Sequence, residues 1–270
     1  KSFFALSFGL FLSSGAQGPN LACSPEPRRV LFLDWEMSVE DLRGRVKLLQ
    51  AGDPSLMRYP DYRRCYRPLA DEIAELKKVV CEGEYDLLIL DSLAMAAGGQ
   101  ELERADAAIR FNAALRSLTC TSLVIGHTPK PQEDQKERSL YGSVFFHNLC
   151  RVSWEVRREK QTICLYQKKN NLGPPHEPVA FRLTVTPDSA TVEQADPFDE
   201  PALAAGLPLV EQVSQSLGES PGLTIKELAD RLGARACSVK AILYRHKKRF
   251  IAVEGKWACA ENKQPKGKTP

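Results

Sequence analysis

The stretch that most constrains the fold is an unbroken apolar run between two aspartates, at residues 86–91. A short run of this kind fits a strand buried on both faces, as in a parallel sheet with helices on each side. Ligands of such sheets bind beyond the carboxyl ends of the strands. Asp91, followed by the hydroxyl of Ser92, is therefore placed to hold Mg²⁺ through water and to present phosphates. Taken alone, the stretch equally fits a buried strand that ends in an ordinary turn aspartate.

Two more apolar runs end in residues with possible chemistry. Residues 29–36 end in Glu36, and residues 121–128 reach His127. A glutamate at this edge can orient and deprotonate a water that attacks a γ-phosphate, and a histidine can donate a hydrogen bond to phosphate. The alternatives are a solvated turn residue or a partner in the next helix's first turn for Glu36, and a structural turn residue for His127. The helix after Glu36 starts at Ser38, with Asp41 at the capping-box position.

The first twelve residues are apolar nearly all round after Lys1 and Ser2. One interpretation is a secretory signal, with a small-residue cleavage region after the apolar core. The other is the first helix of a nucleotide-binding domain, in which Lys1 and Ser2 end a GxxxxGK[ST] phosphate loop. There the lysine reaches the β- and γ-phosphates and the hydroxyl binds Mg²⁺. The stretch alone fits the signal better, but a signal leaves the strand-end acids unexplained, so the second interpretation is preferred.

The middle of the chain predicts helices and an antiparallel region. Helices are expected over 69–82 and 101–118, a loop with a short strand over 51–68, and a mobile segment over 129–138. Alternating patterns predict an antiparallel pair at 151–156 and 161–167, a turn at 168–175 and a strand at 179–185. Residues 187–207 are expected to be a linker.

The C-terminal part predicts a winged helix-turn-helix over residues 208–262. A helix at 208–220, a capped helix at 224–233, a basic helix at 239–250 and a hairpin at 251–258 follow in order, and 263–270 is expected to be disordered. From Gly222 onward there are twelve Lys or Arg against four Asp or Glu, within a chain of net charge +3. This excess suggests a polyanion partner. The predicted DNA contacts are Lys240, Arg245, Lys247, Lys248 and Arg249. A winged helix that contacts protein is the alternative.

The composition also indicates in which cellular compartment the protein is found. The eight cysteines are scattered, with no CxxC pair or ligand-spaced cluster, which is typical of reduced thiols in a cytosolic protein. No apolar run approaches the ~20 residues needed to span a bilayer. The sequence therefore predicts a cytoplasmic protein with no membrane partner.

Taken in order, these motifs resemble the RecA-like ATPases. They are Lys1-Ser2, Asp34-Trp35-Glu36, the Walker B strand ending at Asp91, Val124-Ile125-Gly126-His127-Thr128, Tyr141-Gly142-Ser143 and the stretch Lys168 to Pro175. Among these ATPases the chain is most similar to the RepA-type hexameric replicative helicases of plasmids and phages. The resemblance covers residues 1–186, without the family's first strand and phosphate loop. It implies an α/β fold, with a RecA-like parallel sheet flanked by helices and antiparallel C-terminal strands.

The resemblance also implies roles for individual residues, with ATP and Mg²⁺ as cofactors. The expected ATP-binding residues are Lys1, Ser2 and Asp91, of which Ser2 and Asp91 hold the metal; the expected catalytic residues are Glu36, His127 and Lys169. The basic finger that reaches a neighbouring subunit's ATP is Lys168, Lys169 or Arg182. The segment after His127 matches the family's loops that contact single-stranded DNA in the channel of the ring.

The function expected from this resemblance is an ATP-hydrolysing motor or helicase acting on DNA in plasmid or phage replication. The subunits are expected to form a hexameric ring, with single-stranded DNA in its channel and duplex DNA at the winged helix. The alternatives are an ATP-regulated DNA-binding protein without unwinding activity, a winged-helix repressor with a degenerate ATPase body, and a secreted protein.

Overall fold

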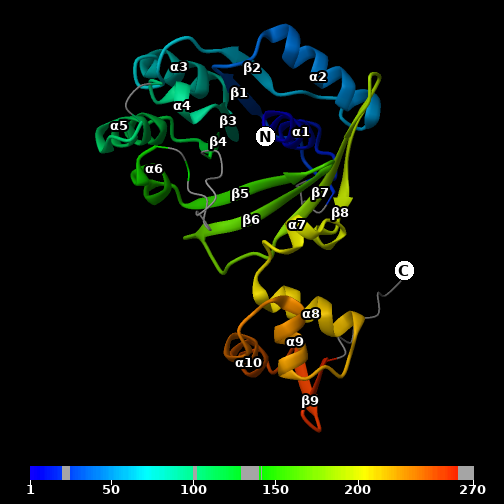
Figure 1. Ribbon diagram of the computed structural model, residues 1–270. Coiled ribbons are helices and arrows are strands. Elements are labelled where there is room, and N and C mark those ends of the chain that lie inside the picture. Colours follow the sequence, from blue (N-terminus) through cyan, green and yellow to red (C-terminus); the bar gives the residue numbers. More distant parts are fainter. Residues whose placement is uncertain (20–24, 100–101, 129–139, 141, 261–270) are drawn as a thin grey trace. The chain divides into compact units, whose positions relative to one another are not determined.

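The computed structural model describes residues 1–19, 25–99, 102–128, 140 and 142–260 (Figure 1). The chain forms two compact units, Lys1–Asp196 and Pro197–Pro270, each considered by itself below. The segment expected to be mobile at 129–138 and the expected disordered tail at 263–270 lie outside the described residues.

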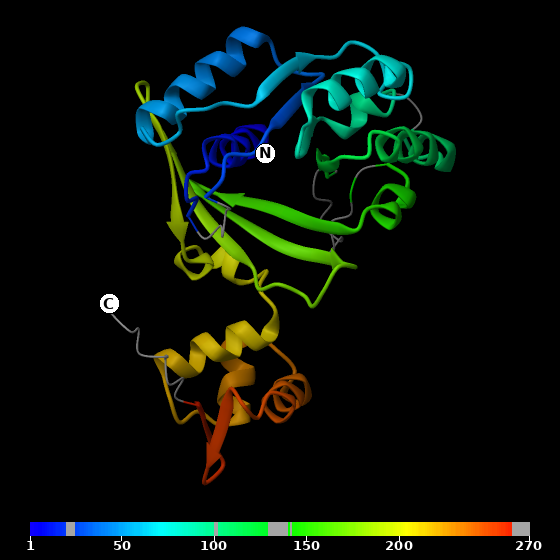
Figure 2. The same ribbon diagram turned by 180° about the vertical axis from the view of Figure 1, so that it is seen from behind.

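A parallel sheet of four strands forms the centre of the first unit, as the apolar runs predicted. Its order is β2-β1-β3-β4, and the strands are β1 (Val30–Asp34), β2 (Asp61–Arg64), β3 (Leu87–Asp91) and β4 (Thr121–Ile125). Every residue of β1 and β3 is buried, whereas the outer strands are partly exposed. Figures 1 and 2 show helices on both sides of this sheet, which confirms the predicted fold class.

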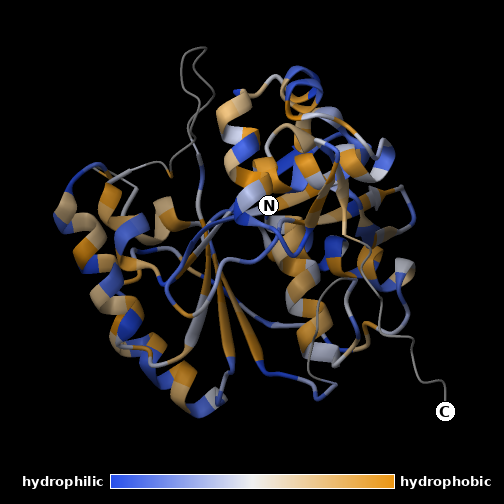
Figure 3. Ribbon diagram, turned by 90° about the horizontal axis from the view of Figure 1, so that it is seen from below, coloured by the Kyte–Doolittle hydropathy of each residue, from blue (hydrophilic) through white to orange (hydrophobic). Residues whose placement is uncertain are grey.

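The helices of the first unit are amphipathic with one exception. They are α1 (Ser2–Ser14), α2 (Val39–Gly52), α3 (Ile73–Gly83), α4 (Leu93–Ala96), α5 (Ala105–Arg116) and α6 (Val144–Leu149). In α2 the buried residues Leu42, Val46 and Leu49 recur at steps of three and four, so one face meets the sheet. Figure 3 shows such helices with hydrophobic and hydrophilic residues along the same element. Among the helices longer than six residues, the exception is α1, which carries no charged residue.

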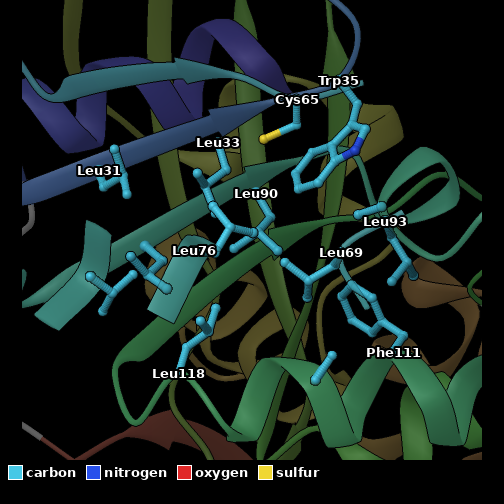
Figure 4. Packing of buried hydrophobic residues seen from close by; sticks show 14 of the residues in the cluster. Leu31, Leu33, Trp35, Cys65, Leu69, Leu76, Leu90, Leu93, Phe111 and Leu118 are labelled. Carbon is cyan, nitrogen blue, oxygen red and sulfur yellow. The ribbon is translucent and has the colours of Figure 1, made fainter. Parts of the chain in front are cut away.

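Alternate residues of the central strands enter two separate cores, because successive side chains of a strand point to opposite faces. Leu31 and Leu33 pack with residues of α3, α4, α5 and α6 (Figure 4). Val30 and Phe32 pack on the other face with α1 and α2. A strand that must be apolar on both faces explains the unbroken runs in the sequence.

The first helix, α1, lies in the second of these cores. Leu6 and Leu10 are fully buried. A Cβ atom at Gly9 would lie 2.9 Å from Pro60 Cγ and 3.0 Å from Ile89 Cδ1, so glycine lets the helix approach the sheet closely. The stretch expected as either a signal core or a helix of the nucleotide-binding domain is thus a core helix.

A second, antiparallel sheet completes the first unit. Its order is β5-β6-β7-β8, from β5 (Val152–Glu159), β6 (Thr162–Asn170), β7 (Val179–Val185) and β8 (Ala190–Ala195). The β7–β8 hairpin lies beside α2 in Figures 1 and 2. The contact is close, since a Cβ atom at Gly52 would lie 2.0 Å from the carbonyl oxygen of Ala190.

This sheet differs from the sequence prediction in two places. The strands β5 and β6 are longer than expected, so only Lys160 and Gln161 separate them, and Lys168 and Lys169 belong to β6 rather than to a turn. The expected linker over 187–207 holds β8, whose six residues all pair with β7. Its residues Thr191–Gln194 are half or fully exposed, and such a strand lacks the strong apolar alternation on which the prediction relied.

The second unit contains three main helices and a hairpin. After η1 (Pro197–Asp199) and α7 (Pro201–Ala204) come α8 (Leu209–Glu219), α9 (Ile225–Leu232), α10 (Ala236–Arg245), β9 (Phe250–Val253) and β10 (Lys256–Cys259). Thr224 and Glu227 form the predicted capping box, and Gly233 ends α9 at φ 59°. One core joins the helices and hairpin around Val213, Leu228 and Leu243.

The basic helix is displaced from its predicted range of 239–250. α10 begins at Ala236 and ends at Arg245, so Lys247 and Lys248 lie in the turn that follows it. The helix cannot continue because Phe250 is buried and pairs with Cys259 in the hairpin.

Candidate nucleotide-binding site

The candidate site begins where β1 and β3 end side by side. Asp34 and Asp91 are register partners at the carboxyl ends of these strands, and their exposed fractions are 0% and 1%. The backbone N–H of Trp35 donates to the carbonyl oxygen of Asp91 at 2.7 Å. Two carboxylates thus lie at the edge where parallel sheets bind ligands.

Asp34 is fully engaged with neighbouring groups. Its Oδ1 accepts hydrogen bonds from the backbone N–H groups of Glu36 at 2.8 Å and Met37 at 3.0 Å. Its Oδ2 accepts from the hydroxyl of Tyr62 at 3.3 Å, and the guanidinium of Arg64 lies 3.6 Å from Oδ1. Burial, reinforced by Asp34, raises the pKa of Tyr62 to about 12, so the phenol keeps the proton that it donates.

Asp91 is in the opposite situation. Among the described residues, neither of its buried carboxylate oxygens has a partner in hydrogen-bond geometry. Burial raises its pKa; the nearby hydroxyl of Ser2 opposes this rise, and the charges of Glu36 and Asp34 add to it. An unpartnered buried carboxylate is costly unless a cation or donor joins it. Carboxylate and hydroxyl oxygens are donors that Mg²⁺ prefers, so Asp91 and Ser2 fit the expected metal.

Lys1 lies at the same edge but does not point at Asp91. Its Nζ donates to the carbonyl oxygen of Gly126, just beyond β4, at 2.8 Å. Burial lowers the pKa of this lysine, and the charge of Glu155 partly offsets that effect. The ammonium of Lys1 therefore lies beside the end of a third strand, β4. It contacts Gly126, the residue that precedes His127.

Glu36 meets groups from two other strands. The hydroxyl of Ser92 donates a short hydrogen bond to Oε1 of Glu36, and Nε2 of His127 lies 3.7 Å from the same oxygen. The side chains of Glu36 and His127 are 40% and 55% exposed, so this part of the site is open to solvent. The structure thus brings together Lys1, Ser2, Glu36, Asp91 and His127, five of the six residues expected from the sequence.

The sixth residue, Lys169, lies apart from this group. Its Nζ donates to the carbonyl oxygens of His147 at 3.2 Å and Asn148 at 2.7 Å, near the end of α6, where a cation is favourable. The neighbouring Lys168 lies 3.1 Å from Glu155. Within this chain both lysines have partners, and a role in a neighbouring subunit's site stays a prediction.

The predicted DNA contacts in the second unit divide into two groups. Lys240, Arg245, Lys247 and Lys248 are exposed. Arg249 is instead bound to α8, where both oxygens of Glu211 accept from its guanidinium, at 2.8 and 2.9 Å. Arg249 therefore ties the start of the hairpin to α8, and its contact with DNA stays a prediction.

Sequence reasoning missed the part played by Asp34 and misplaced that of Ser92. Asp34 directly precedes Trp35 and Glu36, so its position at a strand end was visible, but its partner Tyr62 lies 28 positions away. Ser92 was expected to face the metal, whereas its hydroxyl points to Glu36, 56 positions away. The register of β1 against β2 brings Tyr62 to Asp34, and that of β1 against β3 brings Ser92 to Glu36.

The described residues show no other metal or membrane feature. They contain no group of three or more His, Cys, Asp or Glu side chains that could hold a metal ion. The described helices are all too short or too polar to cross a membrane. The seven cysteines in the described part of the chain are free thiols.

Comparison with known proteins finds one matching family model and similar solved structures. Residues 1–133, just under half of the chain, match a family model described as an AAA domain. The crystal structure of the RadB recombinase aligns at 16% identity and a TM-score of 0.49, over 73% of this chain and 86% of that one. A KaiC-like protein from Pyrococcus horikoshii OT3 aligns at 12% identity and a TM-score of 0.41, over 61% and 75%. No curated protein matches the sequence.

The family match contains α1, β1, β3 and β4, the elements that carry Lys1, Ser2, Glu36, Asp91 and the strand before His127. Together with the strand-end carboxylates, this similarity to an AAA domain supports a nucleotide-binding role for this part of the chain. The closer resemblance to RepA-type helicases stays a prediction.

Proposed function

We propose that the protein is an ATP-hydrolysing RecA-like motor that acts on DNA, of the kind represented by the RepA-type helicases of plasmid or phage replication. The observation that carries the proposal is the unpartnered, buried carboxylate of Asp91 beside Ser2. Glu36 and His127 lie at the same edge of the sheet. A metal–phosphate ligand would satisfy the carboxylate, and the surrounding residues supply a lysine, a general base and a hydrogen-bond donor for phosphoryl transfer.

In this mechanism the residues of the chain bind, orient and accept a proton. Asp91 and Ser2 would hold Mg²⁺, which would neutralise charge on the phosphates. Lys1 exchanges the carbonyl of Gly126 for the β- and γ-phosphates. Glu36 takes a proton from the water that attacks the γ-phosphorus, while the bond to the bridging oxygen breaks and ADP leaves. His127 donates a hydrogen bond to the γ-phosphate. A basic residue from a neighbouring subunit in the proposed hexamer completes the site.

The C-terminal unit is proposed to be a winged helix-turn-helix that binds duplex DNA. The exposed face of α10 carries Lys240, Tyr244 and Arg245 among the small residues Cys237, Ser238 and Ala241. A helix with small residues and cations on its exposed face suits a major groove. Lys247 and Lys248, in the turn after α10, suit phosphate contacts.

The test is ATP hydrolysis by the protein expressed from its complete coding sequence. The proposal expects Glu36→Gln to bind ATP like the wild type and to turn it over about a hundredfold more slowly, within the range of general-base catalysis. Glu40→Gln is the matched control, since Glu40 is exposed in the first turn of α2. Equal turnover by wild type and Glu36→Gln would refute the role of Glu36.

The second candidate is an ATP-regulated DNA-binding protein without unwinding activity. Its supporting observation is that Lys168 and Lys169 are engaged within their own subunit, which leaves the neighbour's site without that contact. A strand-displacement assay separates the two. Unwinding that needs ATP and is lost in Glu36→Gln supports the motor, whereas ATP-dependent duplex binding with no displacement supports the regulator.

A further inference from the structure

The hydrogen bonds around Glu36 constrain one of its two carboxylate oxygens. Ser92 donates to Oε1, and His127 approaches the same atom at 3.7 Å. Among the described residues no hydrogen bond reaches Oε2, and the side chain is 40% exposed. The carboxylate is therefore held by one oxygen, and the side chain remains partly open to solvent.

The backbone beneath Glu36 is fixed as well. Asp34 is 0% exposed, and its Oδ1 accepts from the N–H groups of both Glu36 and Met37. Its other oxygen is held by Tyr62 from β2. The turn that carries Glu36 is thus clamped to the end of β1 through a buried carboxylate whose own orientation is set by the neighbouring strand.

Ser92 is well placed to hold Oε1 of Glu36. It is fully buried and directly follows Asp91, so one strand end supplies both the expected metal ligand and the donor that holds the base. Its hydroxyl is also the donor closest to Glu36, since Nε2 of His127 lies 3.7 Å from the same oxygen.

We propose that Ser92 and Asp34 are positioning residues for the general base, Ser92 by holding Oε1 of Glu36 so that Oε2 accepts the proton of the attacking water, and Asp34 by fixing the turn. This inference rests on the proposed ATPase function. The base removes the proton as the water oxygen bonds to phosphorus, so a small rotation of the carboxylate moves Oε2 away from the water. Misplacement of this kind costs rate rather than substrate binding.

The experiment measures single-turnover hydrolysis and ATP affinity in the complete protein. Ser92→Ala is expected to hydrolyse ATP about tenfold more slowly with unchanged affinity. Ser92→Thr keeps a hydroxyl and is expected to regain most of the rate. Ser117→Ala is the matched control, because this half-buried serine donates to the carbonyl of Ala114 on α5, away from the site. Asp34→Ala, if it folds, should also lose rate more than affinity.

A double-mutant comparison separates positioning from a general structural effect. Once Glu36 is replaced by Gln, the base is gone, so adding Ser92→Ala should not slow the residual reaction further. An equal tenfold loss in both backgrounds, or a wild-type rate for Ser92→Ala, would overturn the proposal while leaving the ATPase intact. If instead wild type and Glu36→Gln hydrolyse ATP equally, the proposed function itself fails.

Discussion

The ends of β1 and β3 carry the same side chain in the same setting, yet the two carboxylates behave differently. Asp34 and Asp91 are paired in register and almost equally buried. Asp34 accepts from two backbone N–H groups and a tyrosine, whereas Asp91 has no partner in hydrogen-bond geometry among the described residues. A satisfied buried carboxylate stabilises the fold, and an unsatisfied one marks a place for a ligand.

The same contrast separates the basic residues of the second unit. Arg249 is held by two hydrogen bonds to Glu211. Lys247 and Lys248, two positions and one position before it, are exposed and form no ion pair with any described residue. Charge alone made all three look like DNA contacts. Their partners show which one belongs to the fold.

The largest effect on stability is expected at Asp34. Asp34→Ala would leave Tyr62 and two backbone N–H groups without their acceptor, and should lower the free energy of unfolding by about 3 kcal/mol. Asp91→Ala in nucleotide-free protein should cost far less, because neither oxygen of Asp91 has a partner in hydrogen-bond geometry among the described residues. Urea unfolding measures both variants. Equal losses at the two positions would remove the distinction between them.

The pH dependence of stability should also differ between wild type and Asp91→Asn. Burial raises the folded-state pKa of Asp91 above the ordinary 3.8, so the folded state binds this proton more tightly than the unfolded state. Stability from this group is therefore greatest at low pH and falls as the pH rises from 3.8 through the raised pKa. Asp91→Asn should lack that fall. If the free energy of unfolding depends on pH in the same way for the two proteins, Asp91 does not have a raised pKa in the folded state.

In the second unit, exposed lysines should affect DNA binding. The double substitution Lys247→Ala and Lys248→Ala is expected to weaken duplex binding about tenfold. It should also reduce the salt slope, the steepness with which the logarithm of the binding constant falls with the logarithm of the salt concentration, by about 2. Fluorescence anisotropy at several salt concentrations measures both quantities. Unchanged affinity and slope would remove these lysines from the interface.

The smallest expected effect is at Arg249. Its pair with Glu211 is partly exposed, so Arg249→Ala should lower the stability of the C-terminal unit by about 1 kcal/mol or less. The salt slope of DNA binding should remain that of the wild type. A loss of slope by about 1 without loss of stability would restore Arg249 as a phosphate contact.

The sequence predicted the parallel sheet well because its central strands must be apolar on both faces. It also indicated the carboxyl edge of this sheet, where Glu36, Asp91 and His127 lie at or just beyond strand ends; that this edge binds a nucleotide stays a prediction. It could not predict that Ser92 turns to Glu36 or that Tyr62 holds Asp34, because both contacts depend on the register between strands far apart in sequence. The partly exposed strand β8 was missed, since it lacks a clear alternating pattern.

The most direct test of the central claim is calorimetric titration of the complete protein with ADP, in Mg²⁺ and in EDTA, for wild type and Asp91→Asn. If Asp91 holds the metal that joins nucleotide to protein, wild type binds at least about tenfold more tightly in Mg²⁺. Asp91→Asn then binds weakly in both conditions. If Asp91→Asn binds as tightly as wild type, with the same dependence on Mg²⁺, the unpartnered carboxylate is not the metal site.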